Sequence, residues 1–246
     1  MRYLILSDLH ANWEALQAVL AQSQSAYDRI VCCGDLVGYG ADPDAVTEWV
    51  RENVATTIRG NHDKATTGLE DLEWFNPIAR QSVLWTQSVM KPANLDYLRG
   101  LAKGPDRIDN FQIVHGSPLD EDEYVVTERE VAQVASYLEA PVAFFGHTHL
   151  QGGFQCHRNG VRRLPTVDED SATQTYELEN EAVYYINAGS VGQPRDADPR
   201  AAYAVYEPEA RLVTLCRAEY DIPAAQRKII AAGLPDLLAL RLEAGV

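Results

Sequence analysis

The first two-thirds of the chain alternates short apolar runs with segments in which apolar residues recur at helical spacing. The apolar runs predict strands at 2–8, 29–35, 55–61, 111–116 and 142–147. The periodic segments predict helices at 12–22, 42–53 and 127–139. Asn12 and Asp42 are suited to cap the first two helices, and Thr127 begins a capping box on the third. Strands alternating with helices indicate βα units and an α/β fold.

Residues 64–104 interrupt this alternation. Their apolar spacing predicts two helices, at 79–90 and 92–101, which we interpret as a helical insertion over one rim of the site formed by the strand ends. Residues 150–180 are polar and irregular, which favours hairpins and loops. The remaining apolar runs predict strands at 183–190, 201–208 and 211–220, the last two as a hairpin, followed by a helical tail from Pro223. With no repeat or linker, residues 1–246 are expected to form one domain with two β layers between helices.

Polar side chains with metal-binding chemistry follow the predicted strands. Successive strands lead into Asp8 and His10, Asp35, Asn61, His115, and His147 with His149. In open α/β sheets, ligands bind outside the carboxyl ends of the strands, so these side chains are expected to converge. Each residue alone is typical of a turn, a helix cap or a hydrogen-bonded core position. Taken together, five of the six histidines fall in the segments SDLH, GNHD, VHG and GHTH, which indicates a common site.

The donor types point to a centre with two metal ions. Carboxylate, amide and imidazole donors suit Mn, Fe, Co, Ni or Zn. Seven ligands are too many for one such ion but suffice for two with a bridging carboxylate. Two ions about 3.5–4 Å apart can clamp the attacking and leaving oxygens at phosphorus. Gly34, Gly60 and Gly146 directly precede ligands, where a missing side chain permits close backbone approach.

The formal net charge of −15 argues against binding duplex nucleic acid, which depends on Lys and Arg. Two divalent cations would add about four positive charges locally, enough to attract a small phosphorylated substrate. The four cysteines, Cys32, Cys33, Cys156 and Cys216, have no CxxC spacing and are expected to be reduced and buried. Without a signal peptide or a membrane-spanning apolar run, the sequence predicts a cytoplasmic protein.

Five motifs resemble those of the calcineurin-like metallophosphoesterase superfamily. They are Asp8-Leu9-His10, Gly34-Asp35-Leu36-Val37-Gly38, Gly60-Asn61-His62-Asp63, Val114-His115-Gly116 and Gly146-His147-Thr148-His149. The stretch 187–196 is similar to the small prokaryotic phosphodiesterase branch, and 7–12 also resembles diadenosine-tetraphosphatase-like members. The resemblance implies an α/β (α+β) fold: a four-layer αββα sandwich of two mixed sheets flanked by helices.

The resemblance also implies a division of the ligands. Asp8, His10 and His149 would hold one metal, and Asn61, His115 and His147 the other. Asp35 would bridge the two metals and so take part in catalysis, with a metal-bridging hydroxide attacking phosphorus.

Three further residues are candidates for work on the substrate. His62, with a pKa near its ordinary value, would be the general acid for the leaving oxygen or a donor to the transition state. Asn12 would either contact phosphate or cap its helix. Arg195 would either clamp a phosphate oxygen or pair with Asp196 or Asp198 as a loop charge.

One departure narrows the activity. Protein Ser/Thr phosphatases carry an Asp-Arg-Gly soon after the Gly-Asp, where this chain has Gly38-Tyr39-Gly40. The Arg that would bind phosphate and the Asp that would support the catalytic His are absent, which speaks against protein phosphatase activity.

We therefore expect a metal-dependent hydrolase of small phosphodiesters, with Mn²⁺ the favoured ion. Dinucleoside polyphosphate hydrolysis is the second possibility, and cleavage of short single-stranded nucleic acid the third. A metal-binding scaffold without activity is the alternative of another class, opposed by the presence of His62 and all seven ligands. Nothing in the sequence indicates the natural substrate or the oligomeric state.

Overall fold

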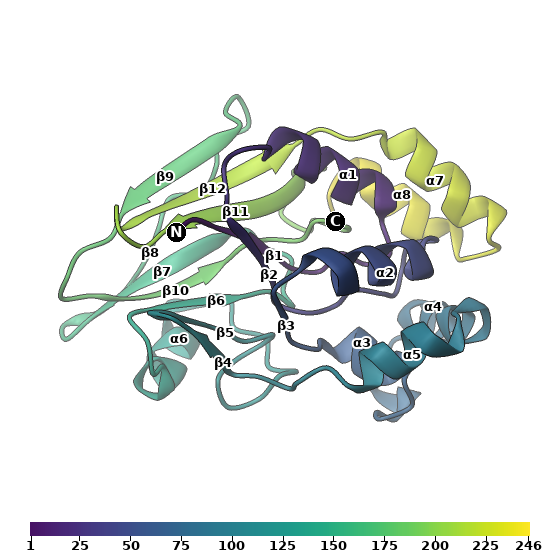
Figure 1. The fold of residues 1–246 in the computed structure, drawn as a ribbon, viewed down its shortest axis with the longest axis horizontal. Helices are drawn as coiled ribbons and strands as arrows, with labels where there is room; N and C mark the ends of the chain where they lie inside the picture. The colour runs from purple at the N-terminus through teal and green to yellow at the C-terminus, as the bar shows by residue number, and fades with distance from the viewer.

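In the computed structural model, which describes residues 1–246, the strands form two six-stranded sheets (Figure 1). The first sheet has the order β3 (Thr56–Thr57), β2 (Arg29–Cys32), β1 (Tyr3–Leu6), β11 (Ala201–Glu207), β12 (Leu212–Ala218) and β9 (Thr173–Glu177). The second has the order β4 (Asp106–Ile108), β5 (Phe111–Ile113), β6 (Val142–Phe145), β10 (Val183–Asn187), β7 (Gly152–His157) and β8 (Gly160–Arg163). Both are mixed: β1, β2 and β3 are parallel, as are β5, β6 and β10, and the other neighbours are antiparallel.

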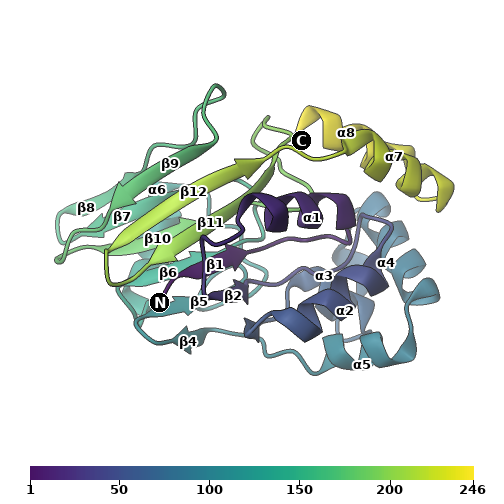
Figure 2. The same cartoon turned by 45° about the horizontal axis from the view of Figure 1, so that its top comes forward.

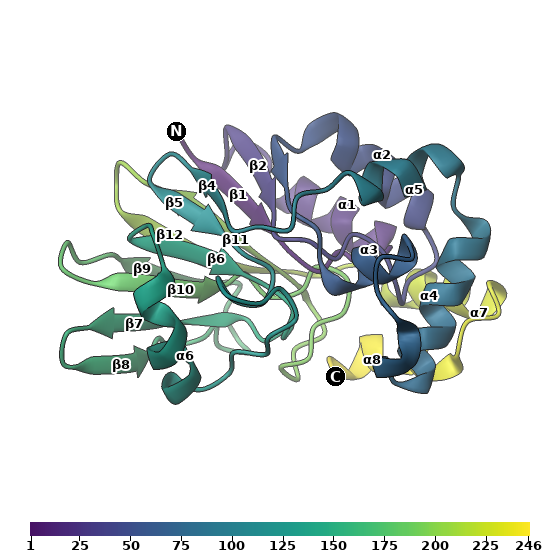
Figure 3. The same cartoon turned by 90° about the horizontal axis from the view of Figure 1, so that it is seen from below.

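Helices cover the outer faces of the two sheets. The helices are α1 (Trp13–Gln22), α2 (Pro43–Asn53), α3 (Asn61–Thr66), α4 (Pro77–Val89), α5 (Pro92–Arg99), α6 (Glu128–Val134), α7 (Ile222–Ala231) and α8 (Asp236–Ala244), with short 3₁₀ turns η1 (Leu72–Trp74) and η2 (Ala135–Tyr137). Helices α1 and α2 share a buried apolar cluster with the first sheet (Figure 2). Helix α6 packs on the second sheet (Figure 3). This is the predicted αββα sandwich. No helix is both long and apolar enough to span a membrane.

The side chains of β1 show why its apolar run does not alternate with polar residues. Tyr3 and Ile5 enter the core between the sheets, whereas Leu4 and Leu6 enter the core beneath the helices. Successive strand residues point to opposite faces, and both faces of this strand are covered. Aromatic rings fill the core between the sheets, with the centroid of Phe111 4.8 Å from that of Tyr3. These packed layers fix the positions of the strand ends.

The structure differs from the sequence-based expectation in three places. The strand expected at 55–61 is shortened to the two residues of β3. Asn61 instead begins helix α3, because Gly60 is extended and the Asp63 carboxylate accepts the Gly60 backbone N–H at 3.0 Å. The polar edge strand β4 lies where none was predicted. The expected helical tail is two helices, separated at Gly233, whose φ is +71°.

The parallel strands place their carboxyl ends at one edge of the molecule. The first ligand candidate follows β1, β5 and β6 by two residues and β2 by three. Helices α3, α4, α5, α7 and α8 gather at this end, whereas β8 and β9 extend towards the other (Figure 1). Residues 150–180, expected as hairpins and loops, therefore supply strands that lie mostly away from the candidate site.

Candidate metal centre

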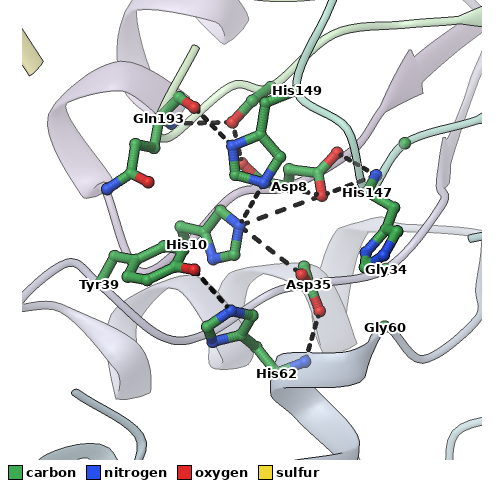
Figure 4. A network of polar contacts seen from close by, with 12 residues as sticks. Asp8, His10, Gly34, Asp35, Tyr39, Gly60, His62, His147, His149 and Gln193 are labelled. Atoms are coloured by element: carbon green, nitrogen blue, oxygen red, sulfur yellow. Dashed lines mark hydrogen bonds and ion pairs between the residues drawn. The ribbon is translucent and has the colours of Figure 1, made fainter. Parts of the chain in front are cut away.

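All seven predicted ligands lie together. Donor atoms of Asp8, His10, Asp35 and His149 fall within 4.8 Å of one another (Figure 4). Donor atoms of Asp35, His115 and His147 form a second such group. The amide oxygen of Asn61 joins the second group, 3.2 Å from His115 Nε2 and 3.0 Å from His147 Nδ1. Asp35 belongs to both groups. All seven except Asn61 are fully buried.

The backbone at the site adopts an uncommon conformation. Five of the ligands have φ between 44° and 63°, in the left-handed region: Asp8, His10, Asp35, His147 and His149. Residues other than glycine rarely adopt this region, and such outliers cluster at functional sites. The conformation turns the chain sharply just beyond each strand and directs the side chains towards a common centre.

Two glycines show how closely the ligand loops approach. A Cβ on Gly60 would lie 2.1 Å from Asp35 Oδ1, and a Cβ on Gly146 would lie 2.4 Å from Asp8 Oδ2. Neither contact is sterically tolerable. The prediction that these glycines permit close approach is confirmed.

The imidazoles are oriented by backbone carbonyls. Three donate through Nδ1–H: His10 to Val37 at 2.9 Å, His115 to Cys33 at 2.8 Å and His149 to Gln193 at 2.6 Å. His147 is reversed, with Nε2 3.0 Å from the Asp122 carbonyl and Nδ1 facing Asn61. A carbonyl only accepts, so the other ring nitrogen of each neutral imidazole directs a lone pair into the cluster.

These lone pairs face one another in a buried cluster, and a bound cation would compensate their mutual repulsion. The Nε2 atoms of His10 and His149 are 3.0 Å apart, and neither carries a proton if both Nδ1 atoms donate. Asp35 Oδ1 accepts the His62 backbone N–H at 2.8 Å. Its Oδ2 lies 3.6 Å from His10 Nε2 and 3.4 Å from His115 Nε2. One carboxylate oxygen thus faces both groups, the arrangement of a bridging ligand.

The electrostatics of the buried groups agree with this donor set. Burial lowers the pKa of His10 and His149 well below the ordinary value and that of His147 to about 3, so these rings are neutral. Burial raises the pKa of Asp8 to about 7. Burial opposes protonation of His115, but the Asp35 carboxylate outweighs it and raises the His115 pKa to about 10. Without a cation, the carboxylates therefore hold a proton on His115.

Known proteins share this arrangement of sequence and fold. The sequence profile described as the calcineurin-like phosphoesterase superfamily domain matches residues 1–211. The chain belongs to this superfamily. An uncharacterized protein of Methanocaldococcus jannaschii is 33% identical over 253 residues, covering 98% of this chain and 97% of the relative. A metallophosphoesterase from Sphaerobacter thermophilus superposes with a TM-score of 0.86 at 37% identity, covering 100% and 99% of the two chains. A hypothetical protein from Pyrococcus horikoshii shares the fold, with a TM-score of 0.78 at 17% identity over 100% and 98%.

The superfamily implies bound divalent metal, and the donors of this chain fit two ions. Asp8, His10 and His149 are placed to hold one ion. Asn61, His115 and His147 are placed to hold the other, and Asp35 lies between the two sets. The oxygen and nitrogen donors are compatible with several first-row metals, among which geometry and metal availability select.

His62 lies beside the centre in a state that differs from the expectation. Burial lowers its pKa to about 4, below the ordinary value expected from the sequence, so the ring is neutral near pH 7. Its Nε2 lies 2.9 Å from the Tyr39 hydroxyl, and its Nδ1 has no hydrogen-bond partner. A neutral imidazole can orient or donate a hydrogen bond, but it does not start as a protonated acid.

The contacts of Asn12 favour the capping alternative. Its Oδ1 accepts the N–H of Ala15 at 3.1 Å, and its Nδ2 donates to the Gly192 carbonyl at 2.9 Å. Both ends of the amide are engaged, and Asn12 does not line the pocket beside the metal ligands. Asn12 thus caps α1, as the capping alternative predicted, and fastens the helix start to the 187–196 segment.

Arg195 has no acidic partner. Its Nη2 donates to the Tyr39 hydroxyl at 3.2 Å and to Gln193 Oε1 at 3.1 Å, and its Nε is buried without a partner. The candidate partners are engaged elsewhere: Asp196 pairs with Arg217, and Asp198 with Arg200 and Arg217. The loop-charge interpretation is therefore excluded.

A pocket of about 410 Å³ opens beside the ligands. Its wall includes Asp35, His147 and His149 as well as Tyr39, His62 and Arg195. The segment between α3 and α4 contributes Glu70, Trp74 and Phe75, and the loop before α6 contributes Asp122 and Tyr124. Metal ligands, a guanidinium and aromatic surface thus share one cavity.

Sequence reasoning missed the residues that hold the ligand loops. The Asp63 carboxylate accepts backbone N–H groups of Leu36, Val37 and Gly60 at 2.9, 3.3 and 3.0 Å, which joins the loops of Asp35 and Asn61. An acidic residue at the third helical position is a signal for such a cap. No comparable signal marks Asp122, whose backbone carbonyl orients His147.

Proposed function

We propose that this protein is a metal-dependent hydrolase of small phosphodiesters. The observation that carries the proposal is the paired donor set around Asp35 Oδ2, open to a pocket that also holds Arg195. A pair of divalent cations in such a centre lowers the pKa of water to produce a nucleophile and neutralises charge developing on phosphoryl oxygens. The chain itself supplies a guanidinium for a non-bridging oxygen and neutral donors around it.

The charges around the pocket favour a diester over more highly charged esters. Arg195 is the one guanidinium in the wall. Lys64 is nearby but already engaged, with Nζ 2.6 Å from Glu70, 3.3 Å from Glu121 and 2.5 Å from Asp122. Glu70 and Asp122 add negative charge to the wall. A diester carries one negative charge at phosphorus, and a monoester or polyphosphate brings more charge towards these carboxylates.

Dinucleoside polyphosphate hydrolysis is the second candidate. Trp74 is 86% exposed and Tyr124 is 54% exposed, and both line the same pocket. Exposed aromatic rings provide faces on which bases can stack. This observation supports a substrate that carries a base or another aromatic group. Assays of diesters and of dinucleoside polyphosphates then determine how many phosphates the substrate contains.

The proposal includes Mn²⁺ as the working ion, a cytoplasmic setting and no duplex nucleic acid partner. The four free cysteines support a reducing compartment. The formal net charge of −15 supports a small substrate rather than duplex nucleic acid.

The first experiment pairs metal analysis with turnover. Metal content is measured by mass spectrometry, and chromogenic diesters and monoesters are assayed with Mn²⁺, followed by dinucleoside polyphosphates. About two metals per chain with diester preference is the expected result. Two metals without turnover of any ester would favour the scaffold alternative, and absence of metal under loading would contradict the ligand assignment.

A further inference from the structure

Tyr39 occupies the segment in which this chain departs from the protein phosphatases. The side chain is 6% exposed, and the residue has φ +62°, in the left-handed region. Its backbone N–H donates to Ser82 Oγ of α4 at 2.5 Å. On one side, Gly38 leaves room for the His62 ring, because a Cβ there would lie 2.4 Å from His62 Nδ1. The fold therefore holds Tyr39 in a strained and tightly packed position beside the metal ligands.

The hydroxyl of Tyr39 connects two groups that are far apart in the sequence. It lies 2.9 Å from His62 Nε2 and 3.2 Å from Arg195 Nη2. The Tyr39 and His62 rings pack together with their centroids 4.4 Å apart, and the Arg195 guanidinium carbon is 5.6 Å from the Tyr39 ring centroid. All three side chains line the pocket.

The partners of His62 decide where the phenolic proton points. Arg195 only donates, so the Tyr39 oxygen accepts from it. A proton on His62 Nδ1 would leave a buried N–H without any partner, next to Gly38. A proton on Nε2 leaves only a lone pair unsatisfied, and buried N–H groups without an acceptor are the rarer defect. With Nε2–H donating as well, the Tyr39 oxygen accepts two hydrogen bonds, and its own proton has no acceptor in the protein.

We propose that Tyr39 donates this proton in a hydrogen bond to an oxygen of the substrate's phosphoryl group or leaving group. The inference rests on the proposed phosphoesterase function. Tyr39 is then the catalytic residue of this segment, and His62 is a positioning residue that acts through it. Arg195 and Tyr39 together replace the arginine and the supporting aspartate that the Gly38-Tyr39-Gly40 segment lacks.

The test is a double-mutant cycle on the Mn²⁺-loaded protein with a phosphodiester. Tyr39→Phe keeps the ring and removes the hydroxyl. Loss of one preorganised donor lowers kcat by roughly 10²-fold, and KM is expected to stay within about threefold. His62→Ala should also lower kcat, but by no more than Tyr39→Phe does, roughly 10²-fold, since His62 acts through the Tyr39 hydroxyl. Because His62 acts through Tyr39, adding Tyr39→Phe to His62→Ala should cost less than about threefold more. Losses that multiply, or a Tyr39→Phe enzyme within threefold of the unmodified one, would overturn the proposal.

Two controls are needed. The first distinguishes loss of the Tyr39 hydroxyl from general structural damage, and the second tests the His62 tautomer independently of the proposed phosphoesterase activity. Tyr220→Phe removes another partly buried phenol oxygen, 3.4 Å from Asn12 Nδ2, and should leave kcat unchanged. Metal content should stay near two in every variant. Proton–nitrogen correlation spectra of the diamagnetic Zn²⁺-loaded protein report the His62 tautomer without turnover. A proton on Nε2 supports the arrangement even if no ester is hydrolysed, in which case only the proposed function fails. A proton on Nδ1 would overturn the inference even in an active enzyme.

Discussion

Arg195 is a partly buried charge whose only side-chain partners are neutral oxygens. Its hydrogen bonds go to Tyr39 and Gln193, so its positive charge is left for an anionic ligand in the pocket. Hydrogen bonds to charged groups contribute about 1.5–3 kcal/mol each. A guanidinium that clamps a phosphate oxygen therefore contributes to substrate binding more than a solvated loop charge does.

We expect Arg195→Ala to raise KM for a phosphodiester roughly 10- to 100-fold, since about 1.4 kcal/mol corresponds to a factor of ten. Metal content should not change, because the Arg195 side chain makes no hydrogen bond to a metal ligand. Its backbone N–H, which donates to the His149 carbonyl at 3.2 Å, is kept in the alanine variant. The matched control is Arg227→Ala, which removes the same charge from the exposed surface of α7. Steady-state kinetics measure KM for both variants, and an unchanged KM in Arg195→Ala would contradict the role of Arg195 in binding a phosphate oxygen.

At the scale of secondary structure, helix α1 depends on Asn12 for its start. The amide both caps the helix and reaches the Gly192 carbonyl in the segment that covers Asp8. Asn12→Ala should lower the free energy of unfolding by about 1–2 kcal/mol, the cost of losing a cap. Chemical denaturation measures this, with Asp221→Ala at the start of α7 as a comparable cap. KM should remain as in the unmodified protein, and a raised KM with intact stability would restore the phosphate-binding role.

The turn η1 places Trp74 at the pocket with most of its surface exposed. Base stacking on an aromatic residue contributes about 1–3 kcal/mol. Trp74→Ala should therefore raise KM about 5- to 100-fold for nucleoside-containing diesters and have little effect on dialkyl esters. Leu84→Ala is the control, since Leu84 is an exposed apolar residue of α4 that does not line the pocket. Equal KM changes for both ester classes would argue against stacking.

The elements around the ligands differ in how well the sequence predicts them. β1 and β6 are continuous apolar runs that lead into Asp8 and His147, so both the strand and its functional end could be predicted. β4 could not, because it has three residues at a sheet edge and little apolar surface to bury. The run 55–61 predicts Asn61 at the end of a strand, whereas the Asp63 cap makes it the first residue of a helix.

The environment of His62 was beyond the reach of any local pattern. Its pKa depends on complete burial, and its hydrogen-bond partner Tyr39 lies 23 positions away in the chain. Arg195 joins the same group from 156 positions beyond Tyr39. Ligand identity follows from residue type and order, but the protonation of a site residue follows from contacts that form only in the folded chain.

At the scale of the whole molecule, the metal centre spans both sheets. Asp8 and Asp35 follow strands of the first sheet, whereas His115 and His147 follow strands of the second. The backbone N–H of His147 donates to the Asp8 carboxylate at 3.1 Å, so the two sheets are already linked at this edge. Ions held between these groups would join the sheets a second time and would compensate the buried lone pairs.

Removing the metals should therefore lower the stability of the entire fold, and not only abolish activity. Free metal at 100 times its dissociation constant stabilises a folded protein by about 2.7 kcal/mol if the unfolded chain does not bind it. For a chain of this size, each kcal/mol shifts Tm by about 2–4 °C, so a chelator should lower Tm by about 5–10 °C. Differential scanning calorimetry with and without chelator measures the shift. Asp35→Asn, which weakens both sites, should make Tm nearly independent of added metal. A Tm that is unchanged by chelation, while activity is lost, would show that the hydrogen bonds between the sheets suffice to hold this edge and that the ions serve chemistry alone.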